Sequence, residues 1–256
     1  ALSISDHHRW ELKPLLREIV LSATYRQTNR VDRDDYERDP ANRYLARGPR
    51  TRLSAEMVRD QALFVSQLLT DRQGGPSVMP PQPDGVWQTV YSGAKWKTAE
   101  GGDRYRRALY TYWRRTSPYP SMMTFDSPTR DLCSARRIST NTPLQALVTL
   151  NDPVYVECSE ALAKRARATH PQDGPSQIEW MLRSVTQRSF SSGQVAALTQ
   201  LHEDLMAEMR SPQQDDPQSR GKQSSRTPSA DHEALHQNAM ALVANTILNL
   251  DWALTK

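Results

Sequence analysis

The sequence predicts an all-α fold: an irregular multi-helix domain with long ordered loops and one disordered insert. Apolar residues recur at three- and four-residue spacing along the whole chain, which is the period of a helix with one buried face. Ser, Thr or Asp precedes several of these segments, in two cases with Pro next, as at a helix N-terminus. Only 10 glycines and 3 phenylalanines in 256 residues argue against a β-sandwich or barrel.

Two helices are expected in the N-terminal half. The first has apolar residues at positions 12, 15, 16, 19, 20 and 23, and Pro14 suits its first turn. After a polar stretch over 28–52, Ser54 is positioned to cap a second helix that ends before Gly74-Gly75-Pro76. Its inner face is expected to contain Val58, Ala62, Val65 and Leu69. Residues 76–103, with four prolines, predict a long ordered loop held by Trp87, Tyr91 and Trp96.

The C-terminal half is expected to hold five longer helices. Residues 105–112 predict a short helix before them, although their aromatic content leaves a strand possible. Thr142-Pro143 begins the first of the five, and Asn151-Asp152-Pro153 ends it and begins the next. Two more follow over 178–185 and 195–205, and the last begins near His232. The domain prediction is a helical domain over 1–210 with its core block at 105–157, a disordered polar insert over 211–231, and a C-terminal helix over 232–256 that packs back on the domain.

Composition excludes several classes of protein. No apolar run approaches the roughly 20 residues needed to cross a bilayer, so no membrane span is predicted. Two cysteines exclude a disulfide scaffold, and neither lies in the C-x-x-C-H motif that attaches haem, so no cofactor is predicted in this chain. The histidine pairs at 7–8 and at 232 and 236 lack a placed third ligand, so no metal site is predicted. Because the chain begins at Ala1 without a leader, we expect a piece of a longer polypeptide.

The positive charge of the chain is concentrated in one segment, residues 104–137, which we call the arginine block. It contains eight arginines and two aspartates, a net charge of +6, whereas the whole chain carries +4. Guanidinium groups favour carboxylate, phosphate or sulfate partners, and interleaved Tyr and Trp are typical of stacking surfaces. The candidate binding residues are Arg106, Arg107, Tyr112, Trp113, Arg114, Arg115, Asp126, Arg130, Arg136, Arg137 and Asn141.

Two interpretations of the arginine block stay open. Its arginines can pair with the protein's own carboxylates and carbonyls, as we expect of Arg136 and Arg137, or they can bind a companion domain or an anionic glycan. Nucleic acid is not expected, because the block lacks lysine and the chain has no helix-turn-helix or zinc-finger signature. An enzyme is the alternative function, with no assigned catalytic residues. Its acid/base candidates are Asp126, Asp131, Asp152 and Glu157.

Several stretches of the chain resemble a known family, the planctomycete secreted-protein domain of unknown function 1553, also called PSD-one. The stretches are IVLSATYRQT (19–28), DPANRYLARGPRTRLSAEMVRDQAL (39–63), GGPSVMPPQPDGVW (74–87), YRRALYTYWRRTSPYPSMMTFDSPTRDLCSARRISTNTPLQALVTLNDPVYVE (105–157) and LNLDWALTK (248–256). The resemblance covers most of the chain, and its central block is long enough to be highly specific.

The resemblance implies an extracytoplasmic location, because members are typically the C-terminal part of large predicted extracytoplasmic bacterial proteins. A companion domain usually precedes this one, often with a cytochrome-c-like haem domain upstream, so haem is an expectation for the parent protein only. The setting in polysaccharide-degrading bacteria favours a redox or carbohydrate role. The family usually has His where Leu16 stands and often has Cys where Cys133 stands, whereas a small residue is usual in place of Cys158. A Cys133–Cys158 disulfide is therefore weakly supported.

Overall fold

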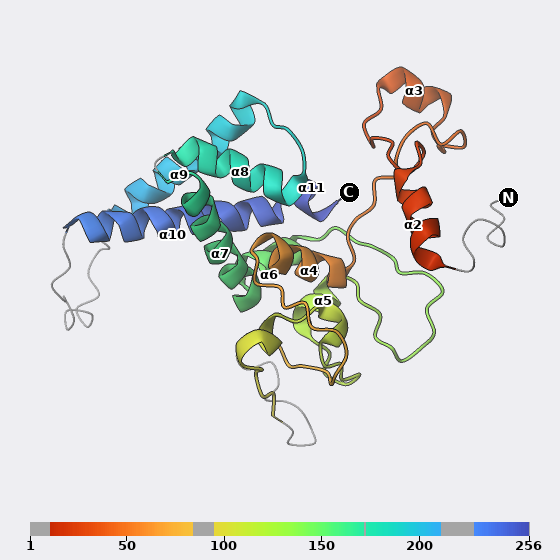
Figure 1. Cartoon of the computed structure of the whole chain (residues 1–256), viewed down its shortest axis with the longest axis horizontal. Coiled ribbons are helices and arrows are strands. Elements are labelled where there is room, and N and C mark those ends of the chain that lie inside the picture. The colour runs from red at the N-terminus through yellow and green to blue at the C-terminus, as the bar shows by residue number, and fades with distance from the viewer. Residues whose placement is uncertain (1–10, 84–94, 172, 211–227, 256) are drawn as a thin grey trace. The chain divides into compact units, whose positions relative to one another are not determined.

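A computed structural model of the chain describes residues 11–83, 95–171, 173–210 and 228–255. Over these residues the fold is all-α, as predicted, with ten α-helices, two short 3-10 helices and no strand (Figure 1). The chain forms two compact units, Ala1–Arg52 with Thr255–Lys256, and Leu53–Leu254. The predicted limits at residues 210 and 231 do not coincide with this division and stay a prediction.

The first unit contains two helices, α2 (Leu12–Leu21) and α3 (Arg33–Arg38). Helix α2 confirms the first predicted helix and ends before Ala23, because Ser22 turns to an extended conformation. None of its residues is buried, so its apolar face is uncovered. Helix α3 was not predicted, because its six residues are polar; Asp32 caps it by accepting a 3.0 Å hydrogen bond from the amide of Asp35.

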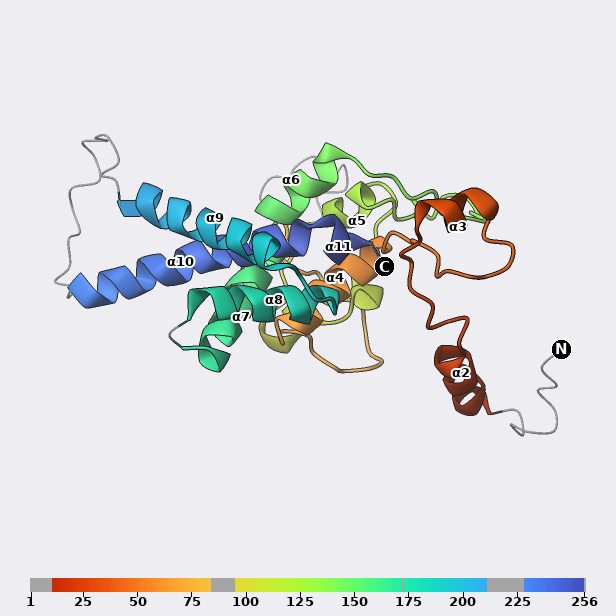
Figure 2. The same ribbon diagram turned by 90° about the horizontal axis from the view of Figure 1, so that it is seen from above.

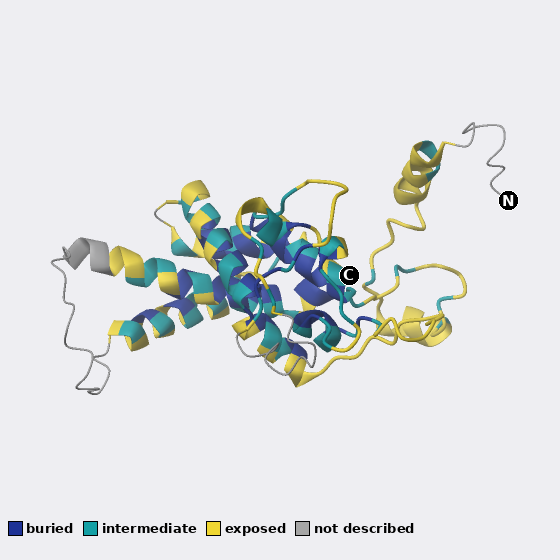
Figure 3. Cartoon of the chain, turned by 90° about the horizontal axis from the view of Figure 1, so that it is seen from below, coloured by how far each residue is buried: buried dark blue, intermediate teal, exposed yellow. Residues whose placement is uncertain are grey.

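The second unit contains the core, built on the long helices α7 (Pro153–Thr169) and α10 (Pro228–Asn249), which pack closely against each other (Figure 2). Fully buried alanines at 163, 166, 239 and 244 provide the small side chains that let these two helices approach. Buried residues gather in the middle of this helical unit (Figure 3). The surrounding helices are α4 (Ala55–Val65), α5 (Pro120–Thr124), α6 (Pro143–Asn151), α8 (Gly174–Thr186), α9 (Ser192–Arg210) and α11 (Asp251–Leu254).

Local signals placed most helix starts correctly. The hydroxyl of Ser54 accepts a hydrogen bond from the amide of Met57 at the start of α4, and Asp152 accepts one from Val154 at the start of α7. Helix α4 ends earlier than predicted, at Val65, because Gln67 takes a left-handed conformation (φ +60°). Leu69 therefore lies beyond the helix. Helices α5 and α11 have five and four residues, too few for a periodic pattern to indicate them.

The predictions for segments 105–112 and 211–231 need correction. Residues 105–112 form neither a helix of their own nor a strand: the 3-10 helices η1 (Gly101–Tyr105) and η2 (Ala108–Tyr110) flank extended residues Arg106 and Arg107. Residues 228–231, predicted to be disordered, begin α10, whereas 211–227 lie outside the described residues. Trp87 and Tyr91 also lie outside them. In the described part of the chain, no helix is long and apolar enough to cross a membrane.

Candidate functional site

The most buried arginine of the block is Arg106, whose side chain closes a loop of the protein itself. It is 0% exposed, and its guanidinium donates hydrogen bonds to the carbonyls of Pro76 (2.9 Å), Arg72 (3.2 Å) and Gly74. The same group lies 3.8 Å from the centre of the Tyr110 ring, and the Tyr110 hydroxyl accepts a 2.7 Å hydrogen bond from the amide of Gly74. Arg106, predicted as a binding residue, is therefore structural.

Two more arginines of the block pair with carboxylates of neighbouring helices. Arg104 forms an ion pair with Glu157 of α7. The Nε of Arg107 lies 3.1 Å from Oδ2 of Asp60 on α4, and the other oxygen of Asp60 accepts a 2.6 Å hydrogen bond from the amide of Ala108. Asp60 thus fixes both the guanidinium and the backbone of the turn at 107–108. These contacts support the interpretation that the block ties the loops to the helical unit.

Arg137 forms a forked ion pair with Glu56 at the start of α4. Its two terminal nitrogens lie 2.6 and 3.0 Å from the two carboxylate oxygens. Partial burial raises the pKa of Glu56, but the hydrogen bonds and charge of Arg137 outweigh it and leave that pKa below its usual value. Neighbouring Arg136 is exposed, and its guanidinium forms no hydrogen bond or ion pair with a described residue. The structural role expected of Arg136 therefore has no support from a described partner and stays a prediction.

Arg137→Ala should lower the free energy of unfolding by about 1 kcal/mol or less, because the ion pair is partly exposed and screened by solvent. Arg136→Ala should leave it unchanged. Thermal and denaturant unfolding of the two variants, followed by circular dichroism, measures both effects. A double-mutant cycle with Glu56→Ala isolates the pair. Equal melting of the two variants would contradict the assignment of Arg137 as the anchored member.

Several aromatic side chains of the block contact other side chains of the protein. The Trp113 indole donates a 3.2 Å hydrogen bond to the carbonyl of Thr129, and the Arg130 guanidinium lies 4.8 Å from its ring centre. Tyr112 meets Trp96 edge-on at 6.5 Å between ring centres, and Trp96 also stacks against the buried Tyr119 at 5.8 Å. Each of these rings thus already has an aromatic or guanidinium neighbour within the protein, which leaves less free ring surface for a sugar or a base to stack on.

Asp126 holds the segment that precedes α6 through hydrogen bonds with Thr140 and Gln145. Its carboxylate accepts hydrogen bonds from the amide (2.7 Å) and hydroxyl (2.9 Å) of Thr140, and from the side-chain amide of Gln145 (3.3 Å). Asp126 also has a left-handed backbone (φ +60°), which Asp tolerates better than most residues. This predicted binding residue therefore acts as an anchor for segment 129–144.

Asp152 lies in a buried polar cluster with Arg59 of α4, Tyr119 and Tyr155. Burial raises the pKa of Asp152 to about 6, although its hydrogen bond to the amide of Val154 and the charge of Arg59 oppose the rise. Burial likewise raises the pKa of Tyr155 well above its usual value. Arg59 is only 2% exposed and donates a 2.9 Å hydrogen bond to the carbonyl of Arg104. Sequence reasoning missed Arg59, because a single arginine in an otherwise ordinary helix carries no signal of its buried partners.

The proposed acid/base carboxylates are placed in different settings. Asp126 is held by Thr140, Glu157 is paired with Arg104, Asp152 is buried at the start of α7, and Asp131 is exposed. Within the described residues, no group of three or more His, Cys, Asp or Glu side chains is arranged to hold a metal ion. Cys133 is exposed and Cys158 buried, both as free thiols, so the disulfide is not formed. Burial raises the pKa of Cys158 to about 12.

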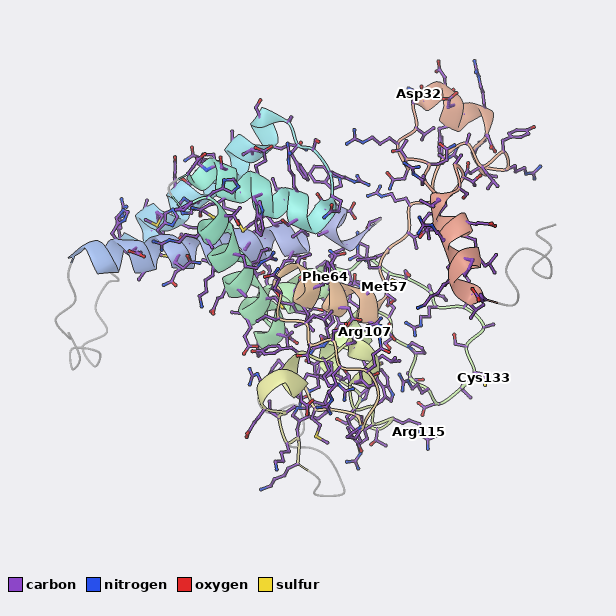
Figure 4. The ribbon with its side chains drawn as sticks, viewed as in Figure 1. Asp32, Met57, Phe64, Arg107, Arg115 and Cys133 are labelled. Atoms are coloured by element: carbon purple, nitrogen blue, oxygen red, sulfur yellow. The ribbon has the colours of Figure 1, made fainter. Side chains whose placement is uncertain are left out.

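A continuous exposed stretch begins in the last part of the block and continues beyond it: every residue of segment 129–144 is exposed. Leu132 and Ile138 are 86% and 79% exposed, and Leu144 at its end is 56% exposed. Arg115, two residues after Trp113, and Asn141, within the segment, are exposed and form no side-chain hydrogen bond or ion pair with another described residue. In Figure 4, Arg115 and Cys133 lie farther from α4 than Arg107, which pairs with Asp60 of that helix. Of the predicted binding residues, Arg130, Arg136, Arg137 and Asn141 lie within this exposed segment, and Arg115 is exposed outside it. Arg114 is half-buried, and its Nε donates a 3.1 Å hydrogen bond to the hydroxyl of Thr116.

Comparison with known proteins finds a family match over most of the chain. A family model described as PSD1, a protein of unknown function (DUF1553), matches residues 3–202. The curated proteins and the solved structures contain no significant match.

Proposed function

The chain belongs to the PSD1 family of proteins of unknown function (DUF1553), as its sequence predicted, and we propose that it is a protein-docking module. Segment 129–144 is its binding element. The partner is the companion domain that the family resemblance leads us to expect in the same polypeptide. A protein partner is proposed because the accessible side chains of the segment include the large aliphatic groups of Leu132 and Ile138.

The observation that carries the proposal is an anchored yet fully exposed segment with large aliphatic side chains. Arg130 against Trp113, Arg137 against Glu56 and Thr140 against Asp126 hold it at three points. Between these anchors Leu132 and Ile138 extend into solvent. Exposed aliphatic groups on a positioned loop gain free energy when a partner covers them, as at protein–protein interfaces.

A protein partner suits this surface better than a glycan does. Sugar binding relies on exposed aromatic faces, whereas the described aromatic rings of the block pack against arginines and one another. The segment presents leucine and isoleucine instead. Its charged residues are three arginines and one aspartate, a net charge of +2, and Arg115 lies nearby. The partner surface should therefore be an apolar groove with acidic residues at its rim.

Leu132→Asp with Ile138→Asp should weaken binding of the separately expressed companion domain by at least about tenfold, because both substitutions place a charge against an apolar groove. Folding should be unaffected, since both side chains are exposed. Isothermal titration calorimetry measures the affinity and a thermal melt measures the stability. Leu109→Asp is the matched control: this residue is 70% exposed but lies outside the segment.

Two results would overturn the docking proposal. One is a companion domain that does not bind the parent chain, and the other is a double variant that binds as tightly as the parent. Binding of an anionic polysaccharide that Arg115→Ala and Arg136→Ala abolish, with the leucine and isoleucine variants unaffected, would favour the glycan interpretation instead.

An extracytoplasmic location and an upstream haem domain are further proposals, supported by the family resemblance alone. The visible absorption of the full-length parent protein tests for haem. The alternative function, a glycan-active redox or hydrolytic enzyme, finds its support in the raised pKa of Asp152, because perturbed pKa values often occur at active sites. Asp152→Asn tests that interpretation against a structural one, because the amide cannot exchange a proton.

A further inference from the structure

A pocket of about 630 Å³ lies between α8 and α9, outside the arginine block. Pro175 and Glu179 of α8 line one side, Val195, Ala196 and Glu203 of α9 line the other, and Phe190, in the connection between the two helices, also lines it. The helices α8 and α9 pack directly against each other (Figure 1), so two regular elements define the pocket. None of the proposed docking residues takes part in it.

The apolar side of the pocket includes Phe190, whose ring packs against a second aromatic side chain. The Phe190 ring packs against Trp252 of α11, with ring centres 5.3 Å apart and the planes tilted by 56°. Val195 and Ala196 extend this wall along the first turn of α9. An alkyl chain that enters the pocket would therefore find a positioned aromatic and aliphatic surface.

The charged groups that line the pocket are both acidic. Glu179 already forms an ion pair with Arg183, with 2.8 Å between Oε1 and a terminal nitrogen. The carboxylate of Glu203 is exposed and accepts no hydrogen bond or ion pair from a described residue, and its charge raises the pKa of neighbouring His202 against the larger, lowering effect of burial. Three uncharged polar side chains, Ser192, Thr199 and Gln200, also line the pocket. The Thr199 hydroxyl donates to the Val195 carbonyl, and the Gln200 amide donates to Asp204.

We propose that this pocket binds an organic cation with an apolar stem, an alkylammonium or alkylguanidinium group. The stem lies against Phe190 and Val195, and the cationic head reaches the carboxylate of Glu203. The opposite charge at one end and the apolar wall along the side together select this chemistry over neutral or anionic molecules of equal length. The cation is either a free amine or a Lys or Arg side chain of a peptide.

Titration calorimetry with hexylammonium tests the proposal directly, with hexanol and hexanoate as probes of equal length. We expect hexylammonium to bind, with an affinity that falls as salt is added, and the other two to bind at least about tenfold more weakly. A lysine amide with a blocked amino terminus forms the second arm. Tighter binding of the blocked lysine identifies a peptide side chain as the source, and tighter binding of hexylammonium identifies a free amine.

Glu203→Gln should reduce the affinity for hexylammonium by roughly tenfold, because it removes the charge and keeps the shape. Glu208→Gln is the matched control: Glu208 is exposed on the same helix but does not line the pocket. Ala196→Phe should block the pocket without unfolding the chain, since Ala196 is exposed. Equal binding of hexanol and hexylammonium, no binding of hexylammonium, or an unchanged affinity in Glu203→Gln would overturn the proposal. None of these results depends on the docking segment.

Discussion

Arg106→Ala should be the most damaging substitution in the arginine block, with a loss of about 3–5 kcal/mol in the free energy of unfolding. The Arg106 guanidinium is wholly buried and donates to three backbone carbonyls over residues 72–76. Alanine would leave these carbonyls without a donor and would remove the cation from the face of Tyr110. The midpoint of a thermal melt should fall by roughly 10 °C.

Two further variants make this expectation specific. Arg106→Lys should also be strongly destabilising, because one ammonium group cannot reproduce a planar fork that reaches three carbonyls. Arg115→Ala is the control, since Arg115 is exposed and its side chain forms no hydrogen bond or ion pair with a described residue. It should change stability by less than about 0.5 kcal/mol. Equal melting temperatures for Arg106→Ala and Arg115→Ala would show that Arg106 does not hold the loop.

Helices whose signals are local could be predicted from the sequence. The caps at Ser54 and Asp152 act within three residues, and the apolar period of α7 and α8 reports directly which face is buried. Short helices could not be predicted, because α5 and α11 are too brief to display a period and depend on tertiary contacts. The 3-10 helices on either side of Arg106 could not be predicted either, because they have only five and three residues.

The candidate site was predicted only in part. The charge pattern indicated that the arginines of segment 104–137 have partners. It left open whether these partners are the protein's own carboxylates and carbonyls or a bound ligand. The choice between these depends on partners far away in sequence: Glu56 is 81 residues from Arg137, and Glu157 is 53 residues from Arg104. A pattern read along one chain segment contains no information about such partners. The pocket between α8 and α9 likewise arises from the spacing of two helices and has no motif.

Asp152→Asn should make the chain more stable above pH 6, by about 3 kcal/mol at most. Burial raises the pKa of Asp152 to about 6, whereas the same carboxyl in the unfolded chain has a pKa near 3.8. Between these pH values the folded chain holds a proton that the unfolded chain releases. Stability therefore falls as pH rises through this window and levels off above it, with about two pKa units converted at roughly 1.4 kcal/mol each.

Asparagine keeps the capping interaction and removes the buried charge. Its side-chain oxygen can still accept the hydrogen bond that the amide of Val154 donates at the start of α7. Denaturant unfolding at pH 4 and pH 8 measures the effect. Parent and variant should have similar stability at pH 4, and the variant should be the more stable at pH 8, where only the parent must bury a carboxylate.

The opposite result would change the interpretation of the whole buried cluster. If Asp152→Asn is less stable than the parent at pH 8, the charge of Arg59 stabilises the carboxylate by more than burial costs, and the two residues form a buried ion pair. If the variant is more stable at pH 8, burying the carboxylate costs the parent stability, as expected of a strained functional group or of a core position that evolution has not optimised. A glycan-directed hydrolytic or redox activity of the parent protein that Asp152→Asn abolishes would identify a functional group. The reason is that an amide cannot exchange the proton that a catalytic carboxyl transfers.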